Sequence, residues 1–183
     1  TSAEIRQLKT KKGNPVMFVN ELLDFMKDKD GVYIEFEMKT NNPMYDEATL
    51  HAYCDKLYKS AMAKRPANSD YVFTSFDKRP LQYLKKQYPG VDLLFIKGEG
   101  LTDKVLEELK ELQITRIGCR IEGTTRSMVQ KAQKDGIVVS LWPGHTVNDF
   151  ILGVTLGANY LCSDVPVEVQ KYVTKNLPWI KLK

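Results

Sequence analysis

The fold of this chain is decided by one stretch, Gly31-Val32-Tyr33-Ile34-Glu35-Phe36-Glu37-Met38-Lys39. Apolar and polar side chains alternate along it, so that one face carries only apolar residues and the other carries tyrosine, two glutamates and lysine. A period of two is the pattern of a β-strand. Taken alone, such a strand suits an antiparallel sheet whose charged face lies in water.

The later strand candidates favour a different kind of sheet. They are apolar along almost their whole length, and an amphipathic helix pattern separates each from the next: 71–76, 91–96, 114–121, 137–142 and 160–164. This alternation is typical of a parallel sheet covered by helices. The polar face of residues 31–39 then has no water to contact unless it lines a site, because buried carboxylates need a metal ion or another cation as partner.

The chain contains about six strand–helix units, preceded by a helix expected from Asn20 to about Lys29. Two architectures use such a series, an open doubly wound sheet and a closed (β/α)8 barrel. No glycine-rich turn follows the first strand, which leaves the dinucleotide-binding form of the open sheet without support. We predict an α/β fold, a (β/α)8 TIM-type barrel in one domain over residues 1–183. It is incomplete, because the chain supplies about six of the eight units.

Helix boundaries are predicted from capping residues and from the apolar pattern. Thr102, Thr125 and Thr146 are expected to cap the helices that follow them, and Pro80 is expected to begin another. The helix that begins at residue 20 is expected to bury four apolar side chains, those of Leu22, Leu23, Phe25 and Met26.

Composition and charge exclude several classes of protein. The net charge of +4 comes from 27 basic and 23 acidic side chains spread along the chain, without a basic helix, so that nucleic acid is not an expected partner. No apolar run approaches the roughly 20 residues of a membrane-spanning helix. The three cysteines lie far apart, which argues against a disulfide framework. Cys119 and Cys162 are expected to be small buried groups within strands.

Candidate functional residues are those at the carboxyl ends of the predicted strands, where the active sites of such barrels lie. There the chain places carboxylates, cations, hydroxyls, aromatic side chains and a histidine: Glu37, Lys39, Ser75, Phe76, Asp77, Lys97, Arg120, Glu122, Trp142, His145, Ser163 and Asp164. Cations beside a carboxylate suit an anionic ligand, such as a phosphate ester, held next to a divalent metal ion.

Several of these residues also have a purely structural interpretation. Asp164 precedes a valine and a proline and is expected to cap a helix. Trp142 is either core or pocket wall, and Lys97 and Arg120 are either ligand contacts or solvated cations. His51, the other histidine, lies on a predicted helix far from the strand ends and is expected at the surface.

Four segments, taken in order, resemble the glycerophosphodiester phosphodiesterase family. They are Glu37-Met38-Lys39, Thr74-Ser75-Phe76, Ser140-Leu141-Trp142, and Gly157-Ala158-Asn159-Tyr160-Leu161-Cys162-Ser163-Asp164-Val165-Pro166. That family shows Glu-Ile-Lys, Ser-Phe, a Trp strand and a Gly-(Val/Ala)-Asp…Thr-Asp-x-Pro ending, in this order, on a (β/α)8 barrel. Each motif is short, whereas the ordered set covers nearly the whole chain.

The resemblance implies metal-dependent cleavage of a small-molecule glycerophosphodiester to glycerol 3-phosphate and an alcohol. The family holds a Ca²⁺ or Mg²⁺ ion with three carboxylates, one of which corresponds to Glu37. It also places a lysine that corresponds to Lys39 near the phosphate, in a catalytic role. Phe76, Trp142 and His145 are then expected to contact the substrate.

The chain also departs from the family pattern. The family's His-Arg-Gly motif, its Glu-x-Asp metal pair and its His-Asp pair do not occur in the 183 residues. His145 stands where the family often has asparagine. We therefore expect this chain alone to be inactive and a parent polypeptide extended at its amino end to be active. The alternative is a non-catalytic barrel, or another parallel α/β domain, that binds a phosphate-containing or other anionic ligand.

Overall fold

Six strands form one parallel sheet in which each strand pairs with its neighbours in the sequence. The computed structural model describes residues 1–181. The strands are β1 (Tyr33–Glu37), β2 (Asp70–Ser75), β3 (Leu93–Gly100), β4 (Arg116–Arg120), β5 (Val138–Gly144) and β6 (Tyr160–Ser163). The strand order never reverses, so that the sheet has the topology of a barrel wall rather than of a doubly wound sheet.

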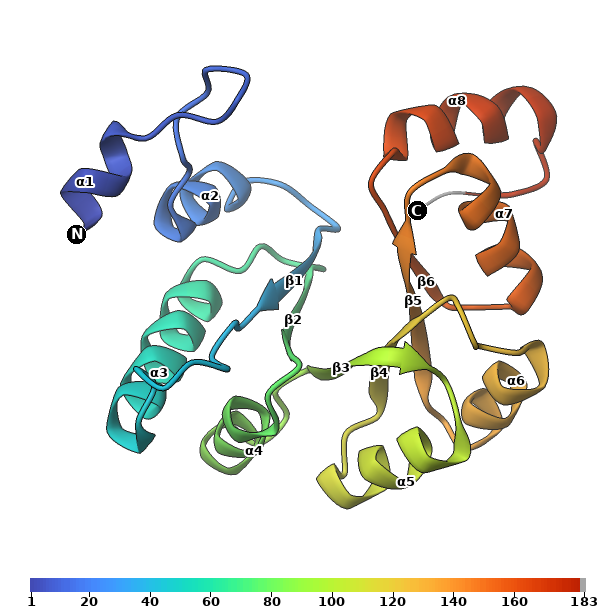
Figure 1. Ribbon diagram of the computed structural model, residues 1–183. Helices are drawn as coiled ribbons and strands as arrows, with labels where there is room; N and C mark the ends of the chain where they lie inside the picture. The colour runs from blue at the N-terminus through green and yellow to red at the C-terminus, as the bar shows by residue number, and fades with distance from the viewer. Residues whose placement is uncertain (182–183) are drawn as a thin grey trace.

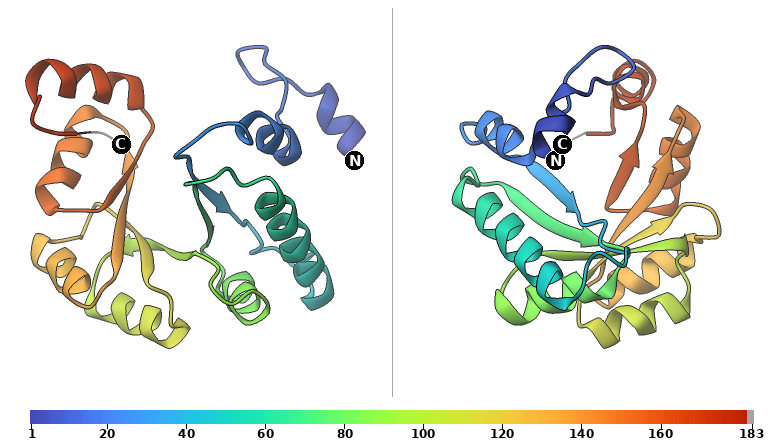
Figure 2. Two further views of the ribbon diagram at one scale, coloured as in Figure 1. Left: turned by 180° about the vertical axis from the view of Figure 1, so that it is seen from behind. Right: turned by 60° about the vertical axis from the view of Figure 1, so that its left-hand side comes forward.

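Helices cover the outer side of this sheet, and the strands curl into a trough (Figure 1, Figure 2). Two helices precede β1, and one helix follows each strand. They are α1 (Ser2–Gln7), α2 (Val19–Met26), α3 (Glu47–Ala63), α4 (Lys78–Gln87), α5 (Asp103–Leu112), α6 (Arg126–Lys134), α7 (Val147–Leu156) and α8 (Pro166–Asn176). Among residues 1–181, none of these helices is long and apolar enough to cross a membrane.

The trough is an open part of a barrel. Within the described residues β1 and β6 do not pair with each other, and Figure 1 shows them on opposite sides of the trough. At the amino ends of the strands, side chains reach across it. The rings of Tyr33 in β1 and Tyr160 in β6 stack with their centroids 4.7 Å apart, and at the starts of the neighbouring strands β3 and β4 Arg116 pairs with Asp92 at 3.1 Å. The predicted incomplete (β/α)8 barrel is therefore confirmed, and these side chains form its floor.

Threonine caps set the starts of three helices, as predicted. The hydroxyls of Thr102, Thr125 and Thr146 each accept the backbone N–H of the third residue along the chain. Gly157 ends α7 with a φ of 85°, a left-handed conformation that glycine adopts without steric cost. Local hydrogen-bond chemistry thus fixes where the helices after β3, β4 and β5 begin.

The start of α4 differs from the prediction. The sequence predicts that Pro80 begins this helix, whereas it begins at Lys78. Asp77 precedes the helix, and its carboxylate accepts the backbone N–H of Arg79 at 3.0 Å, so that an aspartate sets the start. Pro80 still lies in the first turn, where its missing N–H costs no hydrogen bond.

The hydrophobic core lies between the sheet and the helices. Phe36 and Met38, on the apolar face of the deciding stretch, are only 7% and 1% exposed. Leu23 of α2 is fully buried in the same core, whereas Phe25 is 64% exposed and was wrongly predicted to be buried. The two side chains lie two residues, about 200°, apart around the helix, so that one faces the core and the other faces solvent.

Candidate active site

A cavity of about 490 Å³ lies inside the trough, toward the carboxyl ends of the strands. Residues of all six strands, and some of the residues that follow them, line it: Glu35, Glu37, Lys39, Thr74, Phe76, Leu94, Ile96, Gly118, Ser140, Trp142, Pro143, Cys162 and Asp164. Within each strand, nearly all of these residues are spaced two positions apart, because alternate residues of a pleated strand face the same side of the sheet. Five of the predicted site candidates are among them, namely Glu37, Lys39, Phe76, Trp142 and Asp164.

The wall formed by β1 is charged. The Glu37 carboxylate lies 3.4 Å from the Lys39 ammonium, one pleat farther along the chain. Glu35, one pleat nearer the floor, accepts a hydrogen bond from the Tyr33 hydroxyl at 2.7 Å. The Lys39 side chain is 79% exposed, so that it can reach an anionic ligand in the cavity. The predicted inward orientation of Glu35 and Glu37 is confirmed.

The wall formed by the ends of β2 and β5 is aromatic. Phe76 and Trp142 meet edge to face, with ring centroids 5.7 Å apart and planes at 87°. The guanidinium of Arg120 lies 5.5 Å from the centre of the Trp142 ring, in cation–π geometry, and also pairs with Glu122 at 3.0 Å. Trp142 is therefore a pocket wall rather than core, and Arg120 belongs to the same wall.

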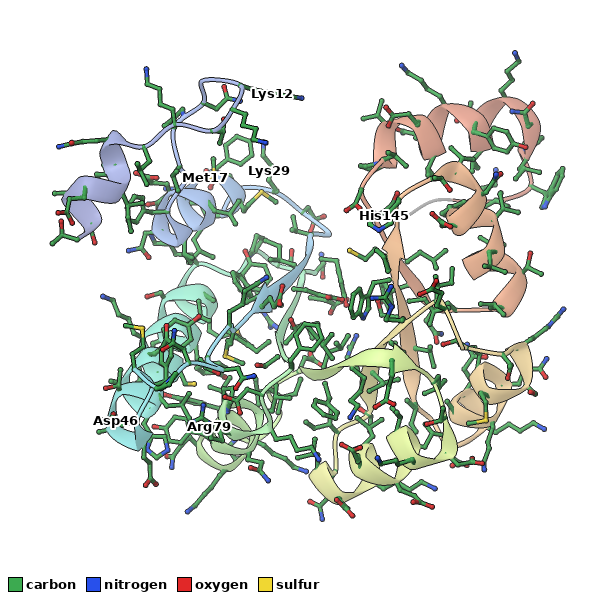
Figure 3. The ribbon with its side chains drawn as sticks, viewed as in Figure 1. Lys12, Met17, Lys29, Asp46, Arg79 and His145 are labelled. Carbon is green, nitrogen blue, oxygen red and sulfur yellow. The ribbon has the colours of Figure 1, made fainter. Side chains whose placement is uncertain are left out.

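His145 does not line the cavity itself but joins it through Asp164. Its Nδ1 atom lies 2.5 Å from the Asp164 carboxylate, and because a carboxylate only accepts, the ring nitrogen donates. His145 lies at the end of β5, on the side that faces β1 (Figure 3). The prediction that Asp164 caps α8 is wrong, since no side chain caps that helix, and Ser163 accepts the N–H of Val165 instead.

Close backbone contact brings His145 and Asp164 together. The N–H of Asp164 donates to the carbonyl of Gly144 at 2.8 Å, which anchors the end of β6 beside the end of β5. A Cβ atom on Gly144 would lie 2.8 Å from the carbonyl oxygen of Cys162, closer than such atoms come in proteins. The pair therefore depends on the absence of a side chain at position 144.

Three predicted rim residues face away from the cavity. The Ser75 hydroxyl is buried and donates to the carbonyl of Met38 at 2.7 Å, and Asp77 caps α4. Lys97 points to the helix side, where it pairs with Glu108 of α5 at 3.1 Å. Their side chains stabilise the frame of the cavity and do not contact a ligand in it.

Polar groups in the middle of the cavity wall were not predicted from the sequence. Thr74 and Ser140 sit within apolar runs, and only the inward register of their strands makes them lining residues. The hydroxyl of Thr74 and the indole nitrogen of Trp142 are both buried without a hydrogen-bond partner in the part of the chain that the structure describes. Such unpaired groups are costly, so that they mark a place where a polar ligand gains hydrogen bonds.

Cys162 is exposed, contrary to the prediction that it is a small buried group, whereas Cys119 is buried as predicted. Its strand lies at the edge of the sheet and its side chain faces the open cavity. Desolvation of the sulfur, followed by the negative charges of Glu35, Asp164 and Glu37, raises the pKa of the thiol. Cys162 is therefore a neutral thiol in an acidic wall.

The described residues do not form a complete metal site. Glu35, Glu37 and Asp164 all line the cavity, but no group of three or more metal-binding side chains converges within residues 1–181. Ca²⁺ and Mg²⁺ take about six or more oxygen ligands. Glu37 has the right chemistry for one ligand, and the set as a whole does not fit such an ion.

A second hollow of about 540 Å³ lies on the outer side of the sheet, between α3 and α4. His51 lines it and stacks on Tyr83, with ring centroids 3.8 Å apart. Arg79 and Lys86 lie in the same groove, and Arg79 is held by Asp77 at 2.7 Å. His51 therefore lies outside the cavity, and it is half-buried against Tyr83 where the sequence predicts a surface residue. This outer groove is separate from the cavity.

Comparison with solved structures supports the fold. A phosphodiesterase from Oleispira antarctica, in complex with the product sn-glycerol-3-phosphate, superposes with a TM-score of 0.81 at 15% identity, over 95% of this chain and 70% of that one. A candidate glycerophosphoryl diester phosphodiesterase from Silicibacter pomeroyi superposes with a TM-score of 0.80 at 20% identity, over 96% of this chain and 68% of that one. A glycerophosphodiester phosphodiesterase from Parabacteroides distasonis superposes with a TM-score of 0.67 at 18% identity, over 96% of this chain and 71% of that one.

Comparison with sequence models of protein families identifies the family of this chain. A search of curated proteins found no match. The sequence model of the glycerophosphoryl diester phosphodiesterase family, in contrast, matches residues 1–168, which include every strand and the residues that line the cavity. The charged and aromatic walls described above thus fall inside the matched region. The chain belongs to the glycerophosphoryl diester phosphodiesterase family.

Proposed function

We propose that the protein hydrolyses glycerophosphodiesters to sn-glycerol 3-phosphate and an alcohol at the cavity inside the trough. The observation that carries the proposal is the Glu37–Lys39 pair, 3.4 Å apart on the cavity wall, in a chain of this family. A solved structure of similar fold holds sn-glycerol-3-phosphate as its product, which supports a ligand of this size and charge. Hydrolysis breaks one P–O bond, and water supplies the hydroxyl of the phosphate product and the proton of the released alcohol.

The two walls of the cavity suit the two ends of such a diester. In our proposal, the Lys39 ammonium lies beside the phosphate and offsets the charge that builds up on its oxygens. Phe76 and Trp142 contact the alcohol on the opposite side, and His145, held by Asp164, lies at the edge of the same region. Lys39, Phe76, Trp142 and Asp164 all line the same cavity, which supports these roles.

Glu37 is the one residue of this chain to which we assign a role in metal binding. Members of this family generally depend on a metal ion, and a bound Ca²⁺ or Mg²⁺ supplies positive charge next to the phosphate. We propose that Glu37 is one of its ligands. Because the described residues do not complete a coordination shell, the roles of Lys39, Phe76, Trp142 and His145 are assigned without the ion.

Comparison of turnover by this chain and by a polypeptide extended at its amino end tests the proposal. We expect the 183-residue chain alone to release no glycerol 3-phosphate, because hydrolysis needs a proton acceptor and a proton donor that we do not assign to its residues. A polypeptide extended at its amino end should hydrolyse glycerophosphodiesters with Ca²⁺ or Mg²⁺. Release of glycerol 3-phosphate is measured for both, with several diesters.

Either of two results would change the proposal. Turnover by the 183 residues alone would mean that the acid and base lie among them. If the extended polypeptide hydrolysed no diester, a barrel that only binds a phosphate-containing ligand would become the better account.

A further inference from the structure

We propose that the aromatic wall of the cavity selects a diester whose alcohol is an uncharged polyol, such as glycerol, over one whose alcohol is choline. This inference rests on the proposed function and names its substrate class. Three observations carry it, and all concern residues that line or adjoin the cavity.

The first observation is the pair of unpartnered polar groups in the wall. The hydroxyl of Thr74 and the N–H of Trp142 are buried, and no hydrogen-bond partner exists for them among residues 1–181. The hydroxyls of a polyol can donate to or accept from such groups, whereas a trimethylammonium group can neither donate nor accept a hydrogen bond. A site built for hydrogen bonds rejects a ligand that leaves them unmade.

The second observation is that a cation already occupies the aromatic face. Quaternary ammonium groups are bound in proteins mainly by the faces of aromatic rings. Here the guanidinium of Arg120 lies 5.5 Å from the centre of the Trp142 ring. Phe76 contacts the same ring in edge-to-face geometry. A choline group would therefore have to displace Arg120 or lie beside a like charge.

The third observation is that the carboxylates of the cavity already have partners. Glu35 accepts from Tyr33 at 2.7 Å, Glu37 pairs with Lys39 at 3.4 Å, and Asp164 pairs with His145 at 2.5 Å. A cationic alcohol would have to compete for each of them. Of these carboxylates, Glu37 is neutralised by Lys39, whereas Glu35, whose partner is an uncharged hydroxyl, keeps its charge one pleat nearer the floor.

Equilibrium binding of two diesters to the full chain tests the proposal. Glycerophosphoglycerol and glycerophosphocholine share the glycerol phosphate half and differ in the second alcohol. Calorimetric titration should show that the glycerol diester binds about fivefold to tenfold more tightly, the range expected for one or two hydrogen bonds. Release of glycerol 3-phosphate is followed in the same samples, which separates binding from hydrolysis.

Matched variants test whether the aromatic wall causes the preference for the glycerol diester. Trp142→Phe keeps the ring and removes the N–H, so that binding of the glycerol diester should weaken while binding of the choline diester stays. The control is Trp179→Phe, since Trp179 is 70% exposed and lies in the chain after α8. Arg120→Gln should strengthen binding of the choline diester. Its control is Arg126→Gln, at an exposed arginine on α6.

Thr74→Val is a second test of the hydrogen bonds if Trp142→Phe does not fold. Tighter or equal binding of the choline diester by the wild type would overturn this inference and leave the proposed function intact. A preference for glycerol that survives both Trp142→Phe and Thr74→Val would also overturn it. If this chain bound neither diester, the inference would fail, whereas the proposed function would fail only if the extended polypeptide cleaved neither.

Discussion

Two pairs of polar side chains lie at opposite walls of the cavity, and they are built in different ways. Glu37 and Lys39 lie two residues apart on one strand, so that the pleat alone puts them on the same face. His145 and Asp164 lie 19 residues apart and meet only because the ends of β5 and β6 touch at Gly144. The first pair is a property of local sequence, and the second is a property of the sheet.

The two pairs share one property, which is exposure to solvent. The side chains of Lys39, His145 and Asp164 are 79%, 68% and 61% exposed, and Glu37 is 35% exposed. Exposed ion pairs stabilise a fold by only about 0–1 kcal/mol. We therefore expect changes in either pair to affect ligand binding and turnover more than the free energy of unfolding.

The largest effect is expected from Glu37→Ala. In a polypeptide extended at its amino end that shows turnover, it should abolish that turnover, because the proposed metal ligand next to the phosphate is lost. Glycerol 3-phosphate release with added Ca²⁺ or Mg²⁺ measures this. Glu111→Gln, at an exposed residue of α5, is the control and should keep wild-type turnover. Normal turnover by Glu37→Ala would remove this pair from the mechanism.

Lys39→Ala and His145→Ala should separate the roles of the two pairs. Loss of the Lys39 charge beside the phosphate should reduce kcat by about 10–100-fold, since the charge acts where negative charge develops. His145→Ala should change KM or the preference among alcohols much more than kcat. Steady-state kinetics of both variants with two diesters checks this. If His145→Ala lost as much kcat as Glu37→Ala, the assignment of His145 to substrate contact would be wrong.

Gly144→Ala should disturb only the pair that depends on the sheet. The added Cβ meets the Cys162 carbonyl oxygen, so that we expect a loss of about 1–3 kcal/mol in the free energy of unfolding, as for overpacked sites. Urea unfolding measures this. Gly98→Ala is the control, because a Cβ at Gly98 meets no atom within 4 Å. Equal stability of the two variants would mean that β5 and β6 do not need this close contact.

The smallest effect is expected from metal ions added to the 183-residue chain. With Glu37 as the one assigned ligand, Ca²⁺ or Mg²⁺ should bind weakly, and a calorimetric titration should show no tight site. Micromolar affinity that disappears in Glu37→Gln would contradict this. It would show that the other ligands come from elsewhere in the same chain.

The sequence predicts what depends on local periodicity. The alternation of residues 31–39 identified the inward carboxylates, and the threonine caps marked three helix starts. The uninterrupted strand–helix series indicated sequential parallel strands, which the sheet confirms. Each of these features follows from side chains within a few residues of one another.

The features that were missed depend on which side a residue faces in a strand that is apolar on both sides. Leu94 and Ile96 face the cavity, while Lys97 faces α5, and no polar alternation in β3 reveals this. Asp164 has the sequence context of a helix cap, and only contact with β5 gives it His145 as a partner. The exposure of Cys162 likewise depends on the edge position of β6.

The central claim is that the ligand binds inside the trough rather than in the outer groove between α3 and α4. Mapping of backbone and side-chain NMR shifts during titration with sn-glycerol 3-phosphate tests it most directly. We predict that the signals that move belong to Glu37, Lys39 and the indole N–H of Trp142. Shifts that gather at His51 and Lys86 instead, with the trough signals unchanged, would contradict the account.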